Sequence, residues 1–210
     1  MILPALMTVD GLDFDYPGQA LFANWSCRLL PGVSLLKGDG GTGKTTLLRL
    51  LAGALPAKSG QLAIKGVAIS NVAAYQRQVF WADPRSAEFD ALDQITPLEY
   101  FKSLEPRYAG LQANLAPHLL DGLGLQEHTH KPFYMLSTGS KRKVLLAAAF
   151  ASGAAVTLLD EPFAALDKPS ISFVMGLLDE QTASRNRAWL VAHYDKPCNA
   201  PLAGTIELVA

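Results

Sequence analysis

The segment from Gly38 to Thr45 restricts the fold of this chain more than any other feature of the sequence. It reads Gly-Asp-Gly-Gly-Thr-Gly-Lys-Thr and fits the spacing G-x-x-x-x-G-K-[ST]. An apolar run, Val33 to Lys37, precedes it, and the leucines of Thr45 to Ala54 follow it with helical spacing. A strand, a glycine-rich loop and a helix in this order predict a phosphate-binding loop in an α/β fold.

Each residue type in this loop has a physical reason. Glycines adopt positive φ and let the backbone approach an anion closely, so that N–H groups at a helix N-terminus point toward it. Lys44 brings a positive charge to the β- and γ-phosphates, and the Thr45 hydroxyl is a suitable oxygen ligand for Mg²⁺. We therefore predict that a nucleotide is bound by Gly38, Asp39, Gly40, Gly41, Thr42, Gly43, Lys44, Thr45 and Thr46. The loop alone does not separate a transporter motor from a GTPase, a small-molecule kinase or a helicase.

A second candidate site lies in Val156 to Pro162, an apolar strand that ends in two adjacent carboxylates. Ligand sites in open α/β sheets lie at the carboxyl ends of strands. We predict that Asp160 holds magnesium there, through water, and that Glu161 activates the attacking water as a general base. The alternative is a pair of ordinary acids at the start of a helix, and the phosphate-binding loop in the same chain favours catalysis.

The remaining pattern alternates strands and helices. We expect strands at Leu21 to Leu30, Gln61 to Ile69, Val156 to Leu159 and Ala188 to Ala192. Helices are expected at Thr96 to Leu104, which opens with a capping box, at about Thr138 to Ser152 and at about Ser170 to Gln181. Such alternation predicts a parallel sheet covered on both faces, with a proline-punctuated helical insertion from Pro84 to about Phe133.

Composition excludes several classes of protein. The 210 residues include 18 basic and 19 acidic side chains, a formal net charge of −1, so nucleic acid is not an expected partner. The N-terminus has no basic region and is not expected to be a secretory signal. Val144 to Leu159 is shorter than the ~20 residues of a membrane helix, so we expect a buried helix and strand and no direct membrane insertion. Cys27 and Cys198 are expected to be reduced packing residues.

The segment from Phe133 to Val144 resembles the LSGGQ signature of ATP-binding cassette (ABC) proteins. Its candidate signature residues are Ser137, Thr138, Gly139 and Ser140, and it lies between the phosphate-binding loop and the acidic strand, as in that family. Tyr16, which we expect ahead of the strands, resembles the family's adenine-stacking aromatic, Leu166-Asp167 its D-loop, and His193 its switch histidine. Leu55 to Gly60 resembles the turn after the first helix. Each match alone is weak, whereas their joint order is specific.

The resemblance implies an α/β fold with a P-loop NTPase core, whose sheet is mixed and mainly parallel. It also implies an N-terminal antiparallel β subdomain and an inserted α-helical subdomain. The single ABC ATPase domain, 1–210, is then divided into a core of about 1–82 and 153–210 and a helical subdomain of about 83–152.

The implied function is ATP hydrolysis coupled to transport, favouring export, with ATP and Mg²⁺ as cofactors and Glu161, His193 and Lys44 as catalytic residues. Ser137 and Gly139 open a helix whose N-terminus is an anion site, and in the family it caps the γ-phosphate held by another subunit. The implied partners are therefore a second ABC ATPase subunit, identical or not, and a separate membrane-spanning subunit. The implied location is cytoplasmic, peripheral on the cytoplasmic face of the inner or plasma membrane.

The sequence departs from the family's pattern at several positions. Asp83 stands where the Q-loop glutamine is expected, and we predict that it replaces the glutamine in coupling the site to the helical insertion. Thr138 and Ser140 replace a glycine and a glutamine of the signature, and Ala164-Ala165 stands where the D-loop usually has a serine. The following run, Lys141-Arg142-Lys143, is either a solvated helix face or a surface that meets acidic partner loops or nucleotide.

Several assignments stay open at this point. Glu161 to Asp167 resembles the compact ATPases of cytochrome c maturation, whereas the Ser-Thr-Gly-Ser-Lys signature leans toward motors of ABC-2-type exporters. A non-transport ABC ATPase acting on a macromolecular complex is the alternative function. Exposed aromatics among Tyr100, Phe101, Tyr108 and Phe89 are expected to mark the dock of the membrane partner, although aromatics are more often buried. His128 and His130 are expected to be solvated loop residues rather than metal ligands.

Overall fold

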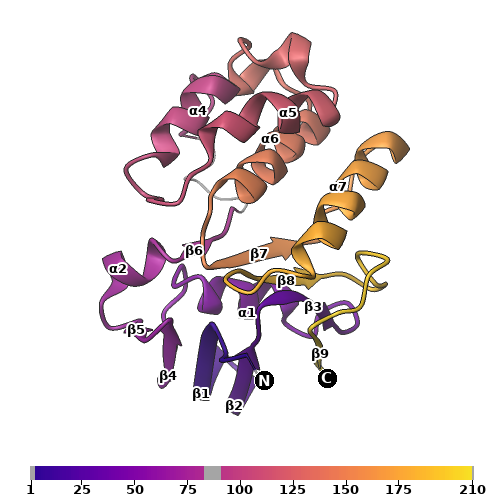
Figure 1. The fold of residues 1–210 in the computed structure, drawn as a ribbon. Coiled ribbons are helices and arrows are strands. Elements are labelled where there is room, and N and C mark those ends of the chain that lie inside the picture. The colour runs from indigo at the N-terminus through magenta and orange to yellow at the C-terminus, as the bar shows by residue number, and fades with distance from the viewer. Residues whose placement is uncertain (1–2, 83–90, 210) are drawn as a thin grey trace. The chain divides into compact units, whose positions relative to one another are not determined.

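A computed structural model describes residues 3–82 and 91–209 of the chain, which are divided between two compact units (Figure 1). The sheet unit comprises 1–81, 155–161 and 178–210, and the helical unit comprises 82–154 and 162–177. The chain therefore passes between the units at 81/82, 154/155, 161/162 and 177/178.

A parallel sheet forms one part of the sheet unit. Its strands run in the order β6-β7-β8-β3-β9, and every described pairing between them is parallel. Their bounds are Gly32–Lys37 for β3, Val79–Phe80 for β6, Val156–Asp160 for β7, Ala188–Ala192 for β8 and Gly204–Glu207 for β9. The continuous apolar runs of β3, β7 and β8 suit strands buried on both faces, as their burial shows.

An antiparallel sheet forms the other part, with strand order β2-β1-β4-β5. Its strands are β1 (Met7–Tyr16), β2 (Gln19–Leu29), β4 (Ser59–Ile64) and β5 (Val67–Ala68). The α/β fold class predicted from the sequence is thus confirmed, with its antiparallel N-terminal part and mainly parallel core. Two details of the prediction were wrong: Tyr16 ends a strand rather than preceding the strands, and the expected strand Gln61 to Ile69 is divided by a turn at Lys65-Gly66.

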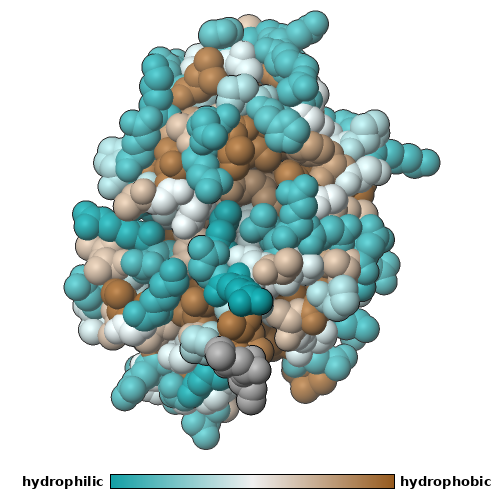
Figure 2. All heavy atoms as spheres, in the orientation of Figure 1, coloured by the Kyte–Doolittle hydropathy of each residue, from teal (hydrophilic) through white to brown (hydrophobic). Residues whose placement is uncertain are grey.

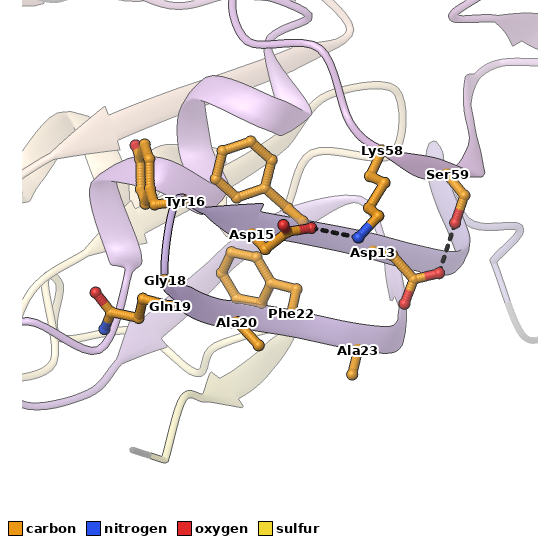
Figure 3. A pocket seen from close by; sticks show the side chains of 11 residues that line it. Asp13, Asp15, Tyr16, Gly18, Gln19, Ala20, Phe22, Ala23, Lys58 and Ser59 are labelled. Atoms are coloured by element: carbon orange, nitrogen blue, oxygen red, sulfur yellow. Dashed lines mark hydrogen bonds and ion pairs between the residues drawn. The ribbon is translucent and has the colours of Figure 1, made fainter.

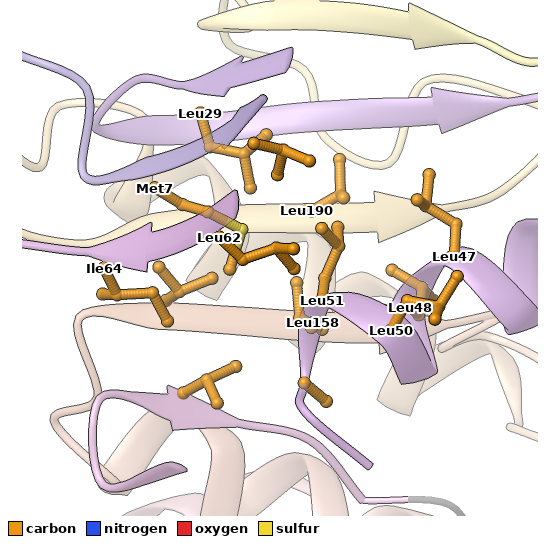
Figure 4. Close-up of a cluster of buried hydrophobic side chains, with 14 of the residues drawn as sticks. Met7, Leu29, Leu47, Leu48, Leu50, Leu51, Leu62, Ile64, Leu158 and Leu190 are labelled. Atoms are coloured by element: carbon orange, nitrogen blue, oxygen red, sulfur yellow. The ribbon is translucent and has the colours of Figure 1, made fainter. Parts of the chain in front are cut away.

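The strand β1 is amphipathic with a change of phase. Met7, Val9, Leu12 and Phe14 are buried, and the pairing with β2 shifts register between Val9 and Leu12. Such a bulge moves the buried positions by one residue and hides the strict alternation that identifies a strand. The core beneath combines these residues with β7, β8 and the helix α1 (Lys44–Leu51), whose Leu47, Leu48, Leu50 and Leu51 are buried (Figure 4). The short helix α2 (Val72–Gln76) completes the described helices that lie wholly in this unit.

The helical unit contains α4 (Pro97–Leu104), α5 (Ala116–Gly122), α6 (Thr138–Ala151) and three short 3₁₀ turns, and α7 (Lys168–Gln181) begins in it. The turns are η1 (Ala113–Leu115), η2 (Gln126–His128) and η3 (Phe133–Met135). The predicted capping box of α4 is present, because Thr96 and Glu99 each accept from the other's backbone N–H. The expected pairing of a buried helix and strand in Val144 to Leu159 is also confirmed by α6 and β7.

The surface gives two further outcomes. Tyr100, Phe101 and Tyr108 are buried, so none of them is an exposed docking aromatic, and Phe89 lies outside the described residues. On the face shown in Figure 2, hydrophobic residues lie in separate patches among hydrophilic ones. Within the described ranges, no helix has both the length and the hydropathy of a membrane span. Cys27 and Cys198 are free thiols, as expected.

Candidate nucleotide site and signature segment

The phosphate-binding loop connects β3 to α1 in the sheet unit. Gly43 caps α1 in the left-handed conformation, with φ of 93°, and a Cβ there would lie 2.9 Å from Leu21 Cδ2. Gly41 also has positive φ, 85°. Both positions favour glycine for backbone conformation, and Gly43 needs it for space as well. The local sequence therefore produces a turn that exposes backbone N–H groups at the start of a helix, where an anion is stabilised.

Lys44 is the first residue of α1 and folds back over the loop. Its Nζ donates hydrogen bonds to the carbonyls of Gly38 and Asp39, the latter at 2.9 Å. The ammonium is therefore held at the loop, and phosphate oxygens are stronger acceptors than the carbonyls it now uses. Thr42 Oγ1 donates to the Asp39 carbonyl at 2.9 Å and closes the turn.

Two oxygens predicted to hold magnesium lie together. Thr45 Oγ1 donates a 2.7 Å hydrogen bond to Asp160 Oδ2, so that α1 and the end of β7 meet at this point. Ligands about 2.1 Å from an octahedral Mg²⁺ lie about 3.0 Å from one another, and both donors are the hard oxygens this ion prefers. The residues present therefore fit Mg²⁺ in donor type and spacing.

Glu161 and His193 follow neighbouring parallel strands, since Asp160 of β7 pairs with Ala192 of β8. Glu161 Oε2 lies 3.8 Å from His193 Nε2. Glu161 has a φ of 46°, uncommon for a residue with a side chain, and its N–H donates to the Ala192 carbonyl at 3.0 Å. The backbone strain at Glu161, the predicted general base, is therefore offset by a hydrogen bond to strand β8.

The His193 ring is oriented by two residues that the sequence analysis did not identify. His193 Nδ1 lies 3.1 Å from both the amide nitrogen and the carbonyl oxygen of Asp195, and the Tyr194 ring stacks on the imidazole with centroids 4.4 Å apart. Neither residue belongs to the pattern used to find His193. The only sequence signal was an aromatic and an acidic residue directly after the strand.

Tyr16 lies at the end of β1, and its hydroxyl is 3.3 Å from Thr46 Oγ1 on α1. The ring meets Phe14 edge-on, at 4.9 Å between centroids, and stays partly exposed. The antiparallel hairpin that carries Tyr16 also lines a hollow of about 670 Å³ (Figure 3). Two contacts from β4 and the residue before it, Lys58 to Asp15 at 2.8 Å and Ser59 to Asp13, close its other side. The predicted adenine-stacking residue therefore stands beside the phosphate-binding loop.

The signature segment lies in the helical unit at the start of α6. Ser137 is the N-cap, and its Oγ accepts from the Ser140 N–H at 3.1 Å and lies 3.0 Å from Ser140 Oγ. Ser137 and Thr138 are exposed, so the first turn of α6 is open to a ligand. A Cβ on Gly139 would lie 2.7 Å from the Ala165 carbonyl oxygen, which explains the glycine.

Asp167, the predicted D-loop aspartate, follows in the same unit. Its Oδ1 accepts from the Ser170 N–H at 2.9 Å and caps α7, while Oδ2 pairs with Lys143 Nζ. The hydrogen bond from Lys143, followed by those from Ser170, holds the pKa of the Asp167 carboxyl well below its ordinary value. The side chain is thus an ion fixed in orientation.

Two further predictions concern Asp83 and a possible metal site. Asp83, predicted at the Q-loop position, lies outside the described residues. His128 Nδ1 is 3.1 Å from Lys131 Nζ. Within ranges 3–82 and 91–209, no group of three or more His, Cys, Asp or Glu side chains is arranged to hold a metal ion.

Known proteins resemble this chain over most of its length. A family model described as "ABC transporter" matches residues 27–164. The cytochrome c biogenesis ATP-binding export protein CcmA of Legionella pneumophila (strain Paris) is 33% identical over 92% of this chain and 96% of its own length. The same-named protein of Pseudomonas syringae pv. tomato is 30% identical over 91% and 89%.

Solved structures show the same fold. An ATP-binding subunit of an ABC transporter superposes with a TM-score of 0.78 at 23% identity, covering 90% of this chain and 79% of that one. A dimeric bacterial ABC transporter cassette superposes with a TM-score of 0.73 at 20% identity, covering 90% and 88%.

The fold and the phosphate-binding loop define a nucleotide-binding protein of the P-loop class. The chain belongs to the ABC transporter family, as an ATP-binding subunit with ATPase activity. The resemblance drawn from the order of the motifs, including that of Glu161 to Asp167 to the compact ATPases of cytochrome c maturation, is confirmed.

Proposed function

We propose that this ATPase drives an exporter, and that it works as an ATP-sandwich dimer on a separate membrane-spanning subunit. The relatives at 30–33% identity are named export proteins, and they match this chain over nearly their full length. The observation that carries the hydrolytic part is the meeting of Thr45 and Asp160 beside the loop, with Glu161 and His193 at the adjoining strand ends.

ATP binding is assigned to the sheet unit. The N–H groups of Gly38 to Gly43 surround the phosphates, and Lys44 exchanges its loop carbonyls for β- and γ-phosphate oxygens. Thr46 continues the first turn of α1 and touches Tyr16, whose ring stacks on adenine. The exposed position of Tyr16 leaves one face of the ring for this contact.

Thr45 and Asp160 are assigned to Mg²⁺, which neutralises charge on the β- and γ-phosphates when bound. Breaking their mutual hydrogen bond frees two oxygens for the ion. Asp160 would hold the ion through water.

Glu161 is assigned as the general base. Its carboxylate takes a proton from water as the water oxygen bonds to the γ-phosphorus and the bond to the β–γ bridging oxygen breaks, giving ADP and phosphate. His193 donates from Nε2 to the γ-phosphate. Nδ1 lies 3.1 Å from both the amide nitrogen and the carbonyl oxygen of Asp195, so the Asp195 backbone orients the ring by its Nδ1 side and leaves Nε2 for the phosphate.

The signature segment and Asp167 are assigned to the partner's ATP. Ser137, Thr138, Gly139 and Ser140 supply a hydroxyl and N–H groups at an exposed helix start, which is an anion site without a phosphate-binding loop of its own. Asp83 is proposed to take the place of the Q-loop glutamine where the chain enters the helical unit. The division into a core and a helical subdomain fits this arrangement, with the helical part receiving the membrane subunit on the cytoplasmic face of the inner membrane.

The test is purification of tagged protein from detergent-solubilised membranes of its native host. Recovery of a polytopic membrane protein in stoichiometric amount, with ATPase activity changed by that subunit, supports the transporter role. Recovery with ribosomes or chromosomal protein instead supports the alternative of a non-transport ATPase. The Glu161→Gln variant tests the dimer separately: with Mg²⁺ and ATP it is expected to double its mass on size-exclusion chromatography, and with ADP to remain a monomer.

A further inference from the structure

The basic run Lys141-Arg142-Lys143 on α6 does not form a freely solvated face. Lys141 Nζ pairs with Asp93 Oδ1 at 2.9 Å, Arg142 Nη1 donates to the Ala164 carbonyl at 2.9 Å, and Lys143 Nζ pairs with Asp167 Oδ2. Two of the three side chains therefore reach the segment Phe163–Asp167, which we call the D-loop. All of these residues belong to the helical unit.

The pair between Lys143 and Asp167 fixes the direction of both side chains. The Lys143 side chain is 13% exposed and the Asp167 side chain 53% exposed, so the lysine reaches out from a packed stem. Asp167 is held from the other side by the Ser170 N–H, at 2.9 Å from Oδ1. Because both carboxylate oxygens are engaged, the aspartate has little rotational freedom.

The backbone of the D-loop also packs on the first turn of α6. The Ala165 carbonyl approaches Gly139 so closely that a Cβ there would lie 2.7 Å from it. Ala165 itself is left-handed, with a φ of 61°, which strains a residue with a side chain. The hydrogen bond from Arg142 to the preceding carbonyl, Ala164, is one interaction that holds the strained turn in place.

We propose that Lys143 and Arg142 are positioning residues that join the D-loop and the signature residues Ser137–Ser140 into one rigid piece. This inference rests on the ATP-sandwich dimer proposed above, in which both segments face the partner's ATP. A partly exposed ion pair adds little to folding stability. Its main effect is therefore to fix the position of the D-loop relative to the signature residues. Small displacements of groups around a reacting centre are costly in rate.

Two substitutions separate the ion pair from other roles of these residues. Lys143→Met keeps the long apolar stem and removes the ammonium. Asp167→Asn removes the charge and keeps the cap of α7, because asparagine caps a helix as well as aspartate does. Each single variant is expected to lower kcat at saturating ATP on the order of 10-fold and to change KM for ATP less than about 2-fold. Lys143→Arg is expected to restore most of the rate.

The double variant is the decisive measurement. If the two residues act through their contact, Lys143→Met with Asp167→Asn has about the kcat of the slower single variant. The matched control is Lys141→Met, which removes the neighbouring lysine and its ion pair to Asp93, outside the D-loop. It is expected to keep kcat within about 2-fold of the wild-type value. Thermal unfolding of every variant is expected to stay within a few degrees of wild type.

Different results would overturn the two proposals. Failure of Glu161→Gln to dimerise with ATP would overturn the sandwich, and the positioning role with it. If Glu161→Gln does dimerise, the positioning role alone fails under any of three results: the single effects multiply in the double variant, Lys141→Met loses as much rate, or kcat falls only in step with thermal stability.

Discussion

The Thr45 hydroxyl donates a 2.7 Å hydrogen bond to the Asp160 carboxylate, joining residues 115 positions apart in the chain. This contact brings the first turn of α1 to the end of β7. It places a hydroxyl and a carboxylate where one hard cation is able to touch both. Glu161, the proposed general base, follows directly on the same strand end.

Substitution of Asp160 or Thr45 is expected to weaken the binding of Mg²⁺ more than the binding of the nucleotide. Asp160→Asn removes the negative charge and Thr45→Ala removes the hydroxyl oxygen, so each should raise the Mg²⁺ concentration for half-maximal ATPase at least about 10-fold. Titration of Mg²⁺ at fixed ATP measures this, with binding of a fluorescent ATP analogue in EDTA as the reference. Thr129→Ala, a threonine bonded only locally to Gln126, is the control. An unchanged titration for both site variants would remove these residues from the metal site.

His193→Ala is expected to lower kcat on the order of 100-fold, since a donor to the γ-phosphate is lost. KM for ATP should change much less, because the loop and Lys44 supply most of the ground-state binding. Steady-state phosphate release measures both constants. His118→Ala is the matched variant, since His118 is exposed and meets only the edge of Phe173 among its described ring contacts. Equal losses in the two histidine variants would contradict the assignment.

Gly139→Ala is expected to destabilise the helical unit by about 1–3 kcal/mol, because its Cβ would meet the Ala165 carbonyl at 2.7 Å. Backbone must move to relieve that contact, so ATPase activity should fall as well. Gly176→Ala is the opposite case: it lies within α7, and a Cβ there meets nothing within 4 Å. That variant should gain about 0.5–1 kcal/mol. Urea unfolding of both proteins measures the difference, and a stabilised Gly139→Ala would refute the close approach.

Burial raises the pKa of the Cys27 thiol to about 12. In the unfolded chain the thiol ionises near about 8.5. Between these two pKa values the native state holds the thiol proton more tightly than the unfolded chain does. The contribution of Cys27 to the free energy of unfolding is therefore complete below about pH 8.5 and decreases as the pH rises toward 12. Cys27→Ala should flatten that part of the stability curve relative to wild type. Urea midpoints at pH 8, 9 and 10 measure the slope, and parallel curves would show that Cys27 does not contribute.

The phosphate-binding loop was predictable because its function needs one local arrangement of residues. Glycines at 41 and 43 are required by backbone conformation, and the flanking apolar run and leucines identify the strand and helix around them. In contrast, β1 escaped prediction because the register shift after Val9 breaks its alternation, and this misplaced Tyr16 relative to the strands.

Contacts between residues far apart in the sequence could not be predicted from it. The basic run on α6 was visible, but whether it faced solvent or a partner depended on where the D-loop returned to α6, at Ala164 and Asp167. The role of Tyr194 could not be predicted for a related reason. Its stacking on His193 depends on the path of the chain after β8, which no periodic pattern fixes.

Glu161 is the last residue of the sheet unit before the chain enters the helical unit at 162, and its φ is positive. Any turning of one unit against the other has to be taken up at the connections between them, and this connection adjoins the carboxylate that is assigned to water activation. Of the four connections between the units, the one at 161/162 therefore carries the residue proposed as the general base.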